Sequence, residues 1–477
     1  MDVQETLVEL LNELSELNAQ YNALQEEFLI SEYSHTDGVS ESVSRGLDRL
    51  DLFSSGDTGF VLSCSALAMF LTLPGISLFY SGAVSIKHVM STFIQTMAVS
   101  AVISVLWMLC GYSLVYSPSQ FDINDKTTIY GDLSRGWLLG MDIDSVHQLS
   151  PTIPETAFCM FQLTHAIFAC AFVIGGFACR TKFLSVLVFM SLWLLLVYCP
   201  LSHMLMHPSG WLFKADVLDF TGSNVTHISA GITALVASYY IGPRTNIQEK
   251  ERFESRNILL SVWGACFVLV GWFGFNMGSS YGSGIAASRA LFGSMLGASS
   301  SSVSWISVEW LRTGSPSILG ILCGAIAGLV SISAGIGYID HTGVVVTGAC
   351  AGFSCYMVVE KVKRIHSVDD PLNTFSMNFV GGLVGGFLVG FFAKLDAGGT
   401  RSHPTGAFYG NANQVCISFY LSSLCNCSNF CYLCAVTYDY LLDLYSIARN
   451  RCDNCVVSSR VRVYSFISRY DHRASSS

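Results

Sequence analysis

Charged side chains are scarce in this sequence. Of its 477 residues, 12% are Asp, Glu, Lys or Arg, whereas 51% are hydrophobic and 42 are glycine. Soluble domains typically carry about 25% charged residues, so the composition excludes a soluble protein and indicates one that crosses a membrane several times. Basic patches are also lacking, which excludes a nucleic-acid-binding function.

Other features are missing from the sequence as well. The N-terminus has no basic segment before an apolar core, so we expect no cleavable signal peptide. The 17 cysteines form no secreted disulfide framework, and ten of them lie in apolar segments, where cysteine acts as a small hydrophobe. Residues 1–57 hold 13 acidic and 2 basic side chains, whereas the rest hold 21 and 23. The net charge of −9 therefore belongs to the N-terminal segment and says nothing about a substrate.

The acidic segment at residues 1–56 is predicted to lie outside the membrane as a helix and a linker. Apolar residues from Leu7 to Phe28 alternate by three and four, which predicts a helix with about three heptads over residues 1–30. That helix is either a lone amphipathic helix or a self-association helix. Residues 31–56 are rich in Ser, Asp and Gly and read as a linker.

Ten apolar segments follow, and each approaches the length of about 20 residues that a helix needs to cross a bilayer. They lie at 58–82, 89–116, 155–179, 183–206, 223–242, 256–280, 287–311, 316–338, 341–361 and 376–396, with an eleventh candidate at 412–442. The loops after odd-numbered segments hold eleven Lys or Arg residues, against six in the alternate loops. Since basic loops stay in the cytoplasm, the sequence predicts an N-terminus outside the cell.

Two halves of five segments must have opposite orientations, because five is odd. Segment five begins near His227 and segment ten near Asn378, and aligning these two residues also aligns Gly231 with Gly382. Inverted repeats of this kind place their polar residues near the bilayer midplane. The predicted fold is therefore an all-α polytopic membrane protein with about 10–11 transmembrane helices, arranged as two inverted five-helix repeats around a central pore.

Asp219 and His227 stand out at the start of segment five. They are eight residues apart, which predicts that both lie on one helix face, about 12 Å apart along the axis. Ionisable side chains in membrane helices commonly mark a functional site. The alternative is a core histidine that is hydrogen-bonded to a neighbouring carbonyl. Glycines spaced by four, at 320, 324 and 328 and at 382, 386 and 390, predict closely packed helices.

Taken together, several segments resemble the ammonium transporter (Amt/Mep/Rh) family, over about residues 57–400. They are GDT at 56–58, TLPGISLFYSG at 72–82, LW at 106–107, GYSL at 111–114, YCPLSH at 198–203, LDF at 218–220 continuing to His227, GWFGFNMGS at 271–279, GAIAGLV at 324–330, GYI at 337–339 and VDDP at 368–371. No single segment is specific, but their number and order are.

The resemblance implies a homotrimer of eleven-helix subunits in the cell membrane, each with its own pore for ammonium or ammonia. It implies an outer vestibule at Phe161 and Ser279, ordered by the buried carboxylate of Asp219. It places Phe275 in the gate below the vestibule and His227 in the pore. It implies no cofactor, and we expect a transporter rather than an enzyme.

Four positions depart from the family pattern. Asn378 stands at the second pore histidine, His165 at a gate phenylalanine, Met206 at the vestibule tryptophan, and Asn373 at an acidic position. Asn378 cannot take up a proton near neutral pH. Met206 removes a cation–π attraction of about 0.5–2 kcal/mol. His165 either restores a titratable group or is a packed histidine that donates to a carbonyl.

These departures leave three functions open. The first is ammonium transport by a modified route, and the second is a non-conducting or weakly conducting ammonium sensor. The third is a membrane enzyme or metal protein that uses His203 and His207, although the family has a histidine at the first position without metal. Residues 401–477 hold the last segment and a Cys-rich tail, in which Cys431–Cys434 and Cys452–Cys455 match a zinc-ribbon spacing in an apolar context. That region is either a divergent eleventh helix or a sequence outside the family pattern.

Overall fold

The computed structural model describes residues 53–118, 128–244, 257–365, 368–395 and 403–418. Its regular elements are all helical in these ranges. The predicted N-terminal helix, the linker up to residue 52 and the Cys-rich tail beyond residue 418 lie outside the described residues. The boundaries predicted at 56 and 400 therefore stay predictions.

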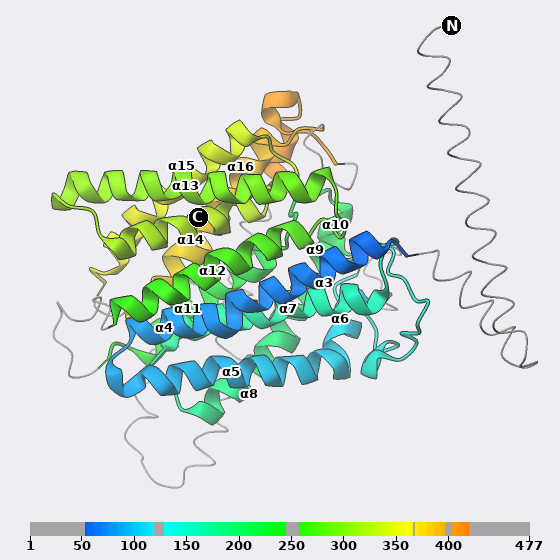
Figure 1. Ribbon diagram of the computed structural model, residues 1–477, viewed down its shortest axis with the longest axis horizontal. Coiled ribbons are helices and arrows are strands. Elements are labelled where there is room, and N and C mark those ends of the chain that lie inside the picture. The colour runs from blue at the N-terminus through cyan, green and yellow to red at the C-terminus, as the bar shows by residue number, and fades with distance from the viewer. Residues whose placement is uncertain (1–52, 119–127, 245–256, 366–367, 396–402, 419–477) are drawn as a thin grey trace, which may run out of the picture. The chain divides into compact units, whose positions relative to one another are not determined.

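Ten helical segments occupy the ten predicted positions (Figure 1). The first five are α3–η1–α4 (Ser55–Phe70, Leu71–Ile76, Ser77–Ala83), η2–α5–η3–α6 (Ile86–His88, Val89–Leu106, Trp107–Gly111, Tyr112–Tyr116), α7–η5 (Glu155–Ile174, Gly175–Phe177), α8–η6–α9 (Phe183–Trp193, Leu194–Tyr198, Cys199–Met206) and η7–α11 (Asn224–Ile228, Ser229–Ile241). The next five are α12 (Ile258–Gly278), α13 (Ile285–Thr313), α14 (Ile318–Ser333), α15 (His341–Val362) and η9–α16 (Phe375–Val380, Gly381–Phe392). Short helices η4 (Gly136–Leu138), α10 (Trp211–Lys214) and η10 (Ala407–Tyr409) lie in connections.

Seven of these helices are long and apolar enough, among the described residues, to cross a membrane by length and composition alone. The other three are the polar or short ones. Segment five carries Asn224 and His227, α13 carries four consecutive serines at 299–302, and α14 has only 16 residues. Ser301 and His227 are buried against neighbouring helices, whereas Ser299 is exposed on the surface of α13.

Small residues bring α13 and α14 close together, as the glycine spacing predicts. A Cβ atom at Gly324 would lie 2.9 Å from Cα of Ser302. A Cβ at Gly328 would meet the backbone of Gly297. Such contacts let helices pack closely in lipid, where there is little hydrophobic force between them.

The described loops gather on two faces, as helices that alternate in direction require. Asp57, in the first turn of α3, accepts a hydrogen bond of 2.7 Å from the amide of Ser283, between the sixth and seventh helices. The amide of Lys394, after the tenth, donates to the carbonyl of Tyr338, after the eighth, over 2.8 Å. On the other face, the loops after helices three, five and nine meet. These loop contacts on two opposite faces are what ten helices that cross the membrane in succession require.

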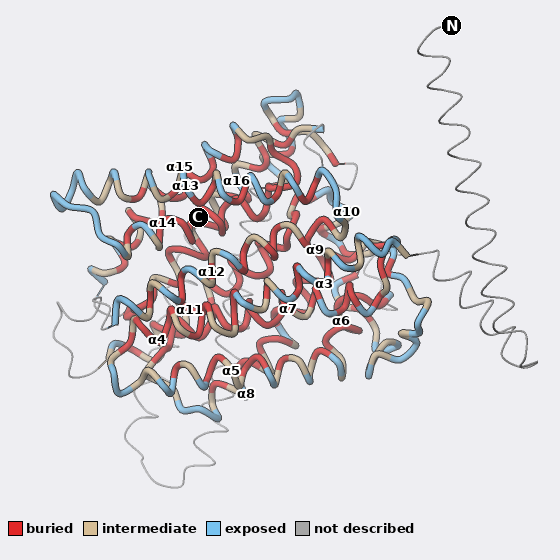
Figure 2. Tube along the Cα trace, in the orientation of Figure 1, coloured by how far each residue is buried: buried red, intermediate tan, exposed pale blue. Residues whose placement is uncertain are grey.

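Helix α7 is the most deeply buried of the seven apolar helices. Of the most apolar 18 residues of this helix, 89% are buried, against 56% or less in the other six helices. Figure 2 shows the buried residues concentrated on the helices that lie between α5 and α13. A helix in this position contributes side chains to the centre of the bundle rather than to its surface.

The residues at 413–418 are helical and begin the eleventh candidate. The Gln414 side chain donates to the carbonyl of Asp216 over 3.1 Å. Val415 lies so close to α16 that a Cβ at Gly390 would be 2.9 Å from its Cα. The start of this segment therefore packs on the bundle like the other helices.

Candidate functional site

A row of rings runs along one side of α7 through the centre of the bundle. Phe161, His165, Phe168 and Phe172 are spaced by four, three and four residues, so they share one helix face. Neighbouring ring centroids are 4.8, 5.5 and 5.9 Å apart. All four side chains are buried. The row forms a closely packed apolar environment that contains one imidazole.

Helix α12 supplies the facing rings. The Phe275 ring lies 4.6 Å from that of His165 and 4.6 Å from that of Phe168. One turn earlier, Trp272 stacks on His227, with ring centroids 5.1 Å apart and planes at 11°. The sequence-predicted gate residues, His165 and Phe275, therefore touch each other. We call these rings, from Phe161 to His227, the aromatic row.

The aromatic row ends at a direct contact between His227 and Asn378, which we call the central pair. Nδ1 of His227 lies 3.0 Å from Oδ1 of Asn378, and the Asn378 amide nitrogen donates to the carbonyl of Thr374 over 3.1 Å. The amide oxygen can only accept, so Nδ1 of His227 carries the hydrogen. Both side chains are buried. The predicted meeting of these two residues from opposite repeats is present in the structure.

Asp219 is not on the helix that carries His227, so the prediction of one shared face is wrong. The chain turns at Gly222, where φ is +72°, and helix η7 begins only at Asn224. The Asp219 carboxylate accepts from the amides of Ser223 and Asn224 over 2.7 and 2.8 Å. It thereby satisfies amides at a helix start that would otherwise lack partners.

The second repeat has the same capped helix start before Asn378. Asp370 is eight residues before Asn378, as Asp219 is before His227, and its carboxylate accepts from the amide of Phe375 over 2.8 Å. Asn373 takes the positive φ, +53°, that Gly222 takes in the first repeat. Each π-helix, η7 and η9, then starts three residues before the central residue.

The two aligned glycines make reciprocal contacts. A Cβ at Gly231 would lie 2.5 Å from the amide nitrogen of Phe379, the residue after Asn378. A Cβ at Gly382 would lie 2.7 Å from the side chain of Ile228, the residue after His227. Each repeat therefore needs a glycine where the other repeat's central residue passes, which supports the two-fold relation between the halves.

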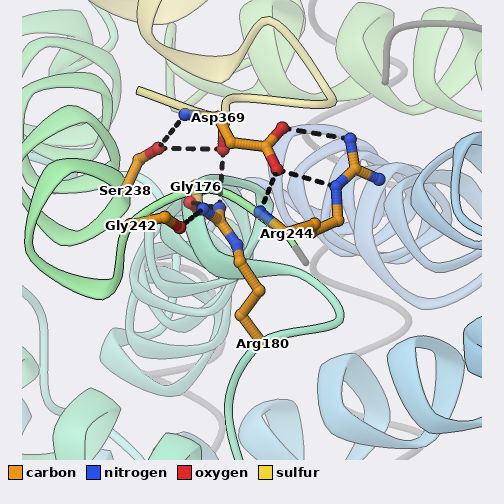
Figure 3. A network of polar contacts seen from close by, with 6 residues as sticks. All are labelled: Gly176, Arg180, Ser238, Gly242, Arg244 and Asp369. Carbon is orange, nitrogen blue, oxygen red and sulfur yellow. Dashed lines mark hydrogen bonds and ion pairs between the residues drawn. The ribbon is translucent and has the colours of Figure 1, made fainter. Parts of the chain in front are cut away.

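A polar cluster, the inner clamp, ties three loops together on the face opposite Asp57 (Figure 3). The Arg244 side chain binds both carboxylate oxygens of Asp369, over 2.8 and 3.0 Å. Arg180 donates to the carbonyls of Asp369 and Gly242, and the Ser238 hydroxyl donates to the Asp369 carbonyl. Burial opposes ionisation of Asp369, but the bonds and charge of Arg244 outweigh it and lower the pKa of that carboxyl.

The residues predicted for the outer vestibule are Phe161, Met206 and Ser279. The Ser279 hydroxyl donates to the carbonyl of Phe275 over 3.0 Å, one turn above the gate. Met206 lies in a second region, where its sulfur is 3.9 Å from the Tyr116 hydroxyl. Rings of Tyr116, Phe158, Tyr281 and Phe161 connect the two regions at centroid distances of 5.0, 5.3 and 6.2 Å.

A cavity of about 480 Å³ lies between the loop that follows α6 and the residues that follow α9. Its lining is Tyr116, Pro118, Thr128, Arg135, Val146, His147, Gln148, Glu155, His207 and Ser209. Burial lowers the pKa of His147 to about 4, so its ring is neutral at neutral pH. Sequence reasoning did not find this cavity, because its lining comes from loops without a motif.

His203 and His207 stack with ring centroids 4.6 Å apart. Both nitrogens of His203 have partners in the protein, the carbonyl of Val115 and the hydroxyl of Thr128, each at 2.7 Å. In the described part of the chain, no group of three or more His, Cys, Asp or Glu side chains is placed to hold a metal ion. The pair therefore has the geometry of packed, hydrogen-bonded histidines.

Ten helices, an inverted repeat and a buried imidazole–amide pair at the end of a row of rings define a multi-pass membrane protein of the channel or transporter class. Residues 59–447 match the Ammonium Transporter Family. The chain belongs to this family. The match runs beyond residue 411, so the family pattern does not end there.

Individual relatives agree with this assignment. An ammonium transporter of Bacillus subtilis is 35% identical over 360 residues, which cover 76% of this chain and 85% of the relative. The crystal structure of Candida albicans Mep2 is 27% identical, with a TM-score of 0.75 over 84% of this chain and 86% of the other. A structure titled Sensor Amt Protein has a TM-score of 0.71 at 20% identity, over 83% of this chain and 95% of the other, which shows the fold alone.

Proposed function

We propose that this protein carries ammonium across a membrane by binding NH4⁺ at an outer vestibule and passing NH3 along the aromatic row. The observation that carries the proposal is the contact of 3.0 Å between His227 and Asn378, from opposite repeats, at the end of that row. Family membership supplies the substrate class. The central pair supplies a place where a small neutral amine can hydrogen-bond within an apolar surround.

Elementary energetics favours the neutral amine as the species that passes. Moving a bare cation into a medium of low dielectric constant costs tens of kcal/mol before compensation. Removing a proton from a cation of pKa ~9–10 at pH 7 costs only about 3–4 kcal/mol, at 1.36 kcal/mol per pKa unit. K⁺ has no proton to lose, so the same barrier gives selectivity.

Each site residue has a role in this proposal. Phe161, Met206 and Ser279 form the recruiting vestibule, and Asp219 orders the helix start beside it. His165 and Phe275 form the gate. His227 and Asn378 bind the passing amine. The ring contacts from Phe161 to His227 support a single path through these positions.

The assembly and orientation are part of the proposal. We place the protein in the plasma membrane as a homotrimer, with its N-terminus outside and the inner clamp in the cytoplasm. The distribution of Lys and Arg among the loops supports this orientation. The trimer is what the family resemblance implies, and each subunit contains its own complete aromatic row.

Rescue of a cell that lacks its own ammonium transporters tests the function. Such cells should grow on low ammonium when they express this protein and fail with an empty vector. Absence of rescue despite surface expression would contradict transport and favour the sensor hypothesis, for which Asn378 and Met206 are the motivating substitutions. Transport that persists after chelation would dismiss the metal-enzyme hypothesis.

Replacing Asn378 by histidine tests the role of the central pair. Asn378→His should produce an ammonium-dependent current at least about tenfold above the signal of the wild-type protein, because it adds a proton acceptor at a position where the amide of Asn378 takes up no proton. Electrophysiology on membranes that contain the variant measures it. Asn413→His, at an exposed position, is the matched control. An unchanged current in Asn378→His would show that position 378 does not limit proton transfer.

A further inference from the structure

Two buried ring nitrogens in the aromatic row have no hydrogen-bond partner within the described residues. They are Nε2 of His165 and Nε2 of His227. The two side chains are 1% and 0% exposed. Leaving a buried polar atom unpaired is unfavourable, so two such atoms along one row of rings indicate a ligand that visits both.

The hydrogen bonds of each ring fix what these nitrogens can do. Nδ1 of His165 lies 3.0 Å from the carbonyl oxygen of Phe161, which only accepts, so Nδ1 carries the hydrogen. Nδ1 of His227 carries a hydrogen for the same reason, because it faces Oδ1 of Asn378. Both Nε2 atoms therefore present lone pairs, and both are acceptors for an N–H group.

The surroundings of His165 are apolar rings from two helices. Phe161 and Phe168 flank it on α7 and Phe275 faces it from α12. Phe168 also lies 6.2 Å from His227, so one ring separates the two imidazoles. The titratable groups that face this region are His227 on η7, Tyr281 beyond the end of α12, and Cys64 on α3 beside Gly278.

We propose that His165 takes the proton of the substrate. In this chain the proton acceptor therefore lies nearer to Phe161 and Ser279 than the central pair does. The inference rests on the proposed function and assigns its first chemical step. One N–H bond of NH4⁺ breaks, a bond between that proton and Nε2 of His165 forms, and NH3 and an imidazolium result. Nδ1–H stays bonded to Phe161. The substrate class is ammonium or a small primary amine.

Asn378 decides where that proton goes. Its Oδ1 accepts a hydrogen bond from His227 but does not take up a proton near neutral pH, so the chain of acceptors ends at the central pair. The imidazolium of His165 therefore returns its proton to solvent water on the side of Phe161 and Ser279. NH3 crosses alone, and transport is electroneutral.

The test is uptake of methylammonium by vesicles that contain the full-length protein, at pH 6 and pH 8. The neutral amine is about a hundredfold more abundant at pH 8 than at pH 6, because it increases tenfold per pH unit below the amine's pKa. His165→Phe should reduce uptake at least tenfold at pH 6 and less than threefold at pH 8. His165→Gln, which can still donate to Phe161 but cannot hold a proton, should behave in the same way. His88→Phe is the control outside the site.

A second readout is a pH dye inside the vesicles. Addition of ammonium to the wild-type protein should make the interior alkaline without an electrical current, because NH3 binds a proton after it arrives. An equal reduction at both pH values in both variants, or none, would overturn the role of His165. A current without alkalinisation would overturn the return of the proton. No uptake by the wild-type protein would instead overturn the proposed function itself, and this inference with it.

Discussion

At the scale of single residues, the proposed vestibule departs from the family pattern at Met206. Met206 contributes a thioether where the family resemblance implies an indole, and its sulfur lies 3.9 Å from the Tyr116 hydroxyl. A thioether has no ring face for a cation. The Tyr116 ring packs in turn against Phe158, with ring centroids 5.0 Å apart.

Substitution of Met206 by tryptophan should therefore strengthen recruitment. A cation–π interaction of about 0.5–2 kcal/mol predicts a half-saturating ammonium concentration roughly 2- to 30-fold lower. Concentration-dependent uptake in vesicles measures this. Met206→Leu, which keeps the volume without an aromatic ring, should leave it unchanged. An equal shift in both variants would assign the effect to packing.

Single-residue predictions from sequence succeeded where the repeat constrained them. The contact of His227 with Asn378 follows from aligning two helix starts. For His165, the structure adds that Nδ1 is hydrogen-bonded to the Phe161 carbonyl, as the packed-histidine alternative predicts, while Nε2 stays unpaired. Phe168 and Phe172 were not predicted, because apolar residues at helical spacing look the same whether they line a site or fill a core. Their spacing of seven and eleven residues from Phe161 places them on the same helix face, and this spacing could have identified them.

At the scale of elements, the inner clamp holds the loop that leads into η9. Asp369 is fully buried and binds Arg244, and the next residue, Asp370, accepts from the amide of Phe375. The clamp and the helix start therefore share one short loop. A change in the clamp is expected to reach Asn378 through this loop.

Arg244→Met should destabilise the protein by about 3–5 kcal/mol, the usual cost of leaving one partner of a buried ion pair unpaired. Thermal unfolding in detergent measures the loss. Lys363→Met removes a pair with Glu360 whose side chains are 34% and 31% exposed. That control should change stability by about 1 kcal/mol at most. Similar losses in both variants would contradict a structural role for the clamp.

The two capping carboxylates should make stability depend on pH. Burial, opposed by backbone hydrogen bonds, raises the pKa of Asp370 from 3.8 to about 6, and the pKa of Asp219 likewise. The folded protein thus binds these protons more tightly than the unfolded chain, so stability gained at low pH is lost as pH rises through about 6. Each group contributes about 3 kcal/mol over that range.

Buried histidines such as His147, whose pKa is lowered to about 4, act in the opposite direction, so the contribution of the carboxylate is measured as a difference between variants. Relative to the wild type, Asp370→Asn, which can still accept from the Phe375 amide, should become more stable as the pH rises from 5 to 7.5. Asp142→Asn, at an exposed loop position, should leave the profile as it is in the wild type. A profile in Asp370→Asn identical to the wild type would contradict the raised pKa.

The start of segment five shows why the prediction of one shared helix face for Asp219 and His227 was wrong. Eight residues of helix would put Asp219 and His227 on one face, but the chain between them turns at Gly222 before the helix begins. Gly222 was the available signal for a turn with positive φ. Nothing in the second repeat gives the same signal, since Asn373 occupies that position there.

At the scale of the whole molecule, the positions of ten helices could be predicted from apolar segment length because lipid imposes that length. Three of the predicted segments, which form η7–α11, α13 and α14, are more polar or shorter than the other seven. Their existence follows better from the repeat, which requires five helices in each half. How the halves pack depends on close contacts such as those of Gly231 and Gly382.

Orientation can be tested with epitopes at two positions. An epitope at the N-terminus should bind antibody on intact cells. An epitope inserted at Gly314, in the exposed turn between α13 and α14, should bind only after permeabilisation. Surface expression of both proteins, measured by biotinylation, is the control. The opposite pattern would reverse the predicted direction and place the inner clamp outside.

The equal spacing of eight residues from each buried aspartate to its central residue constrains how the gene can vary. An α-helix turns by about 100° per residue, so a residue inserted or deleted between the capping aspartate and the central residue would rotate the central side chain relative to the capped helix start. The number of residues from 219 to 227 and from 370 to 378 must therefore stay constant. An insertion or a deletion there would separate the imidazole from the amide.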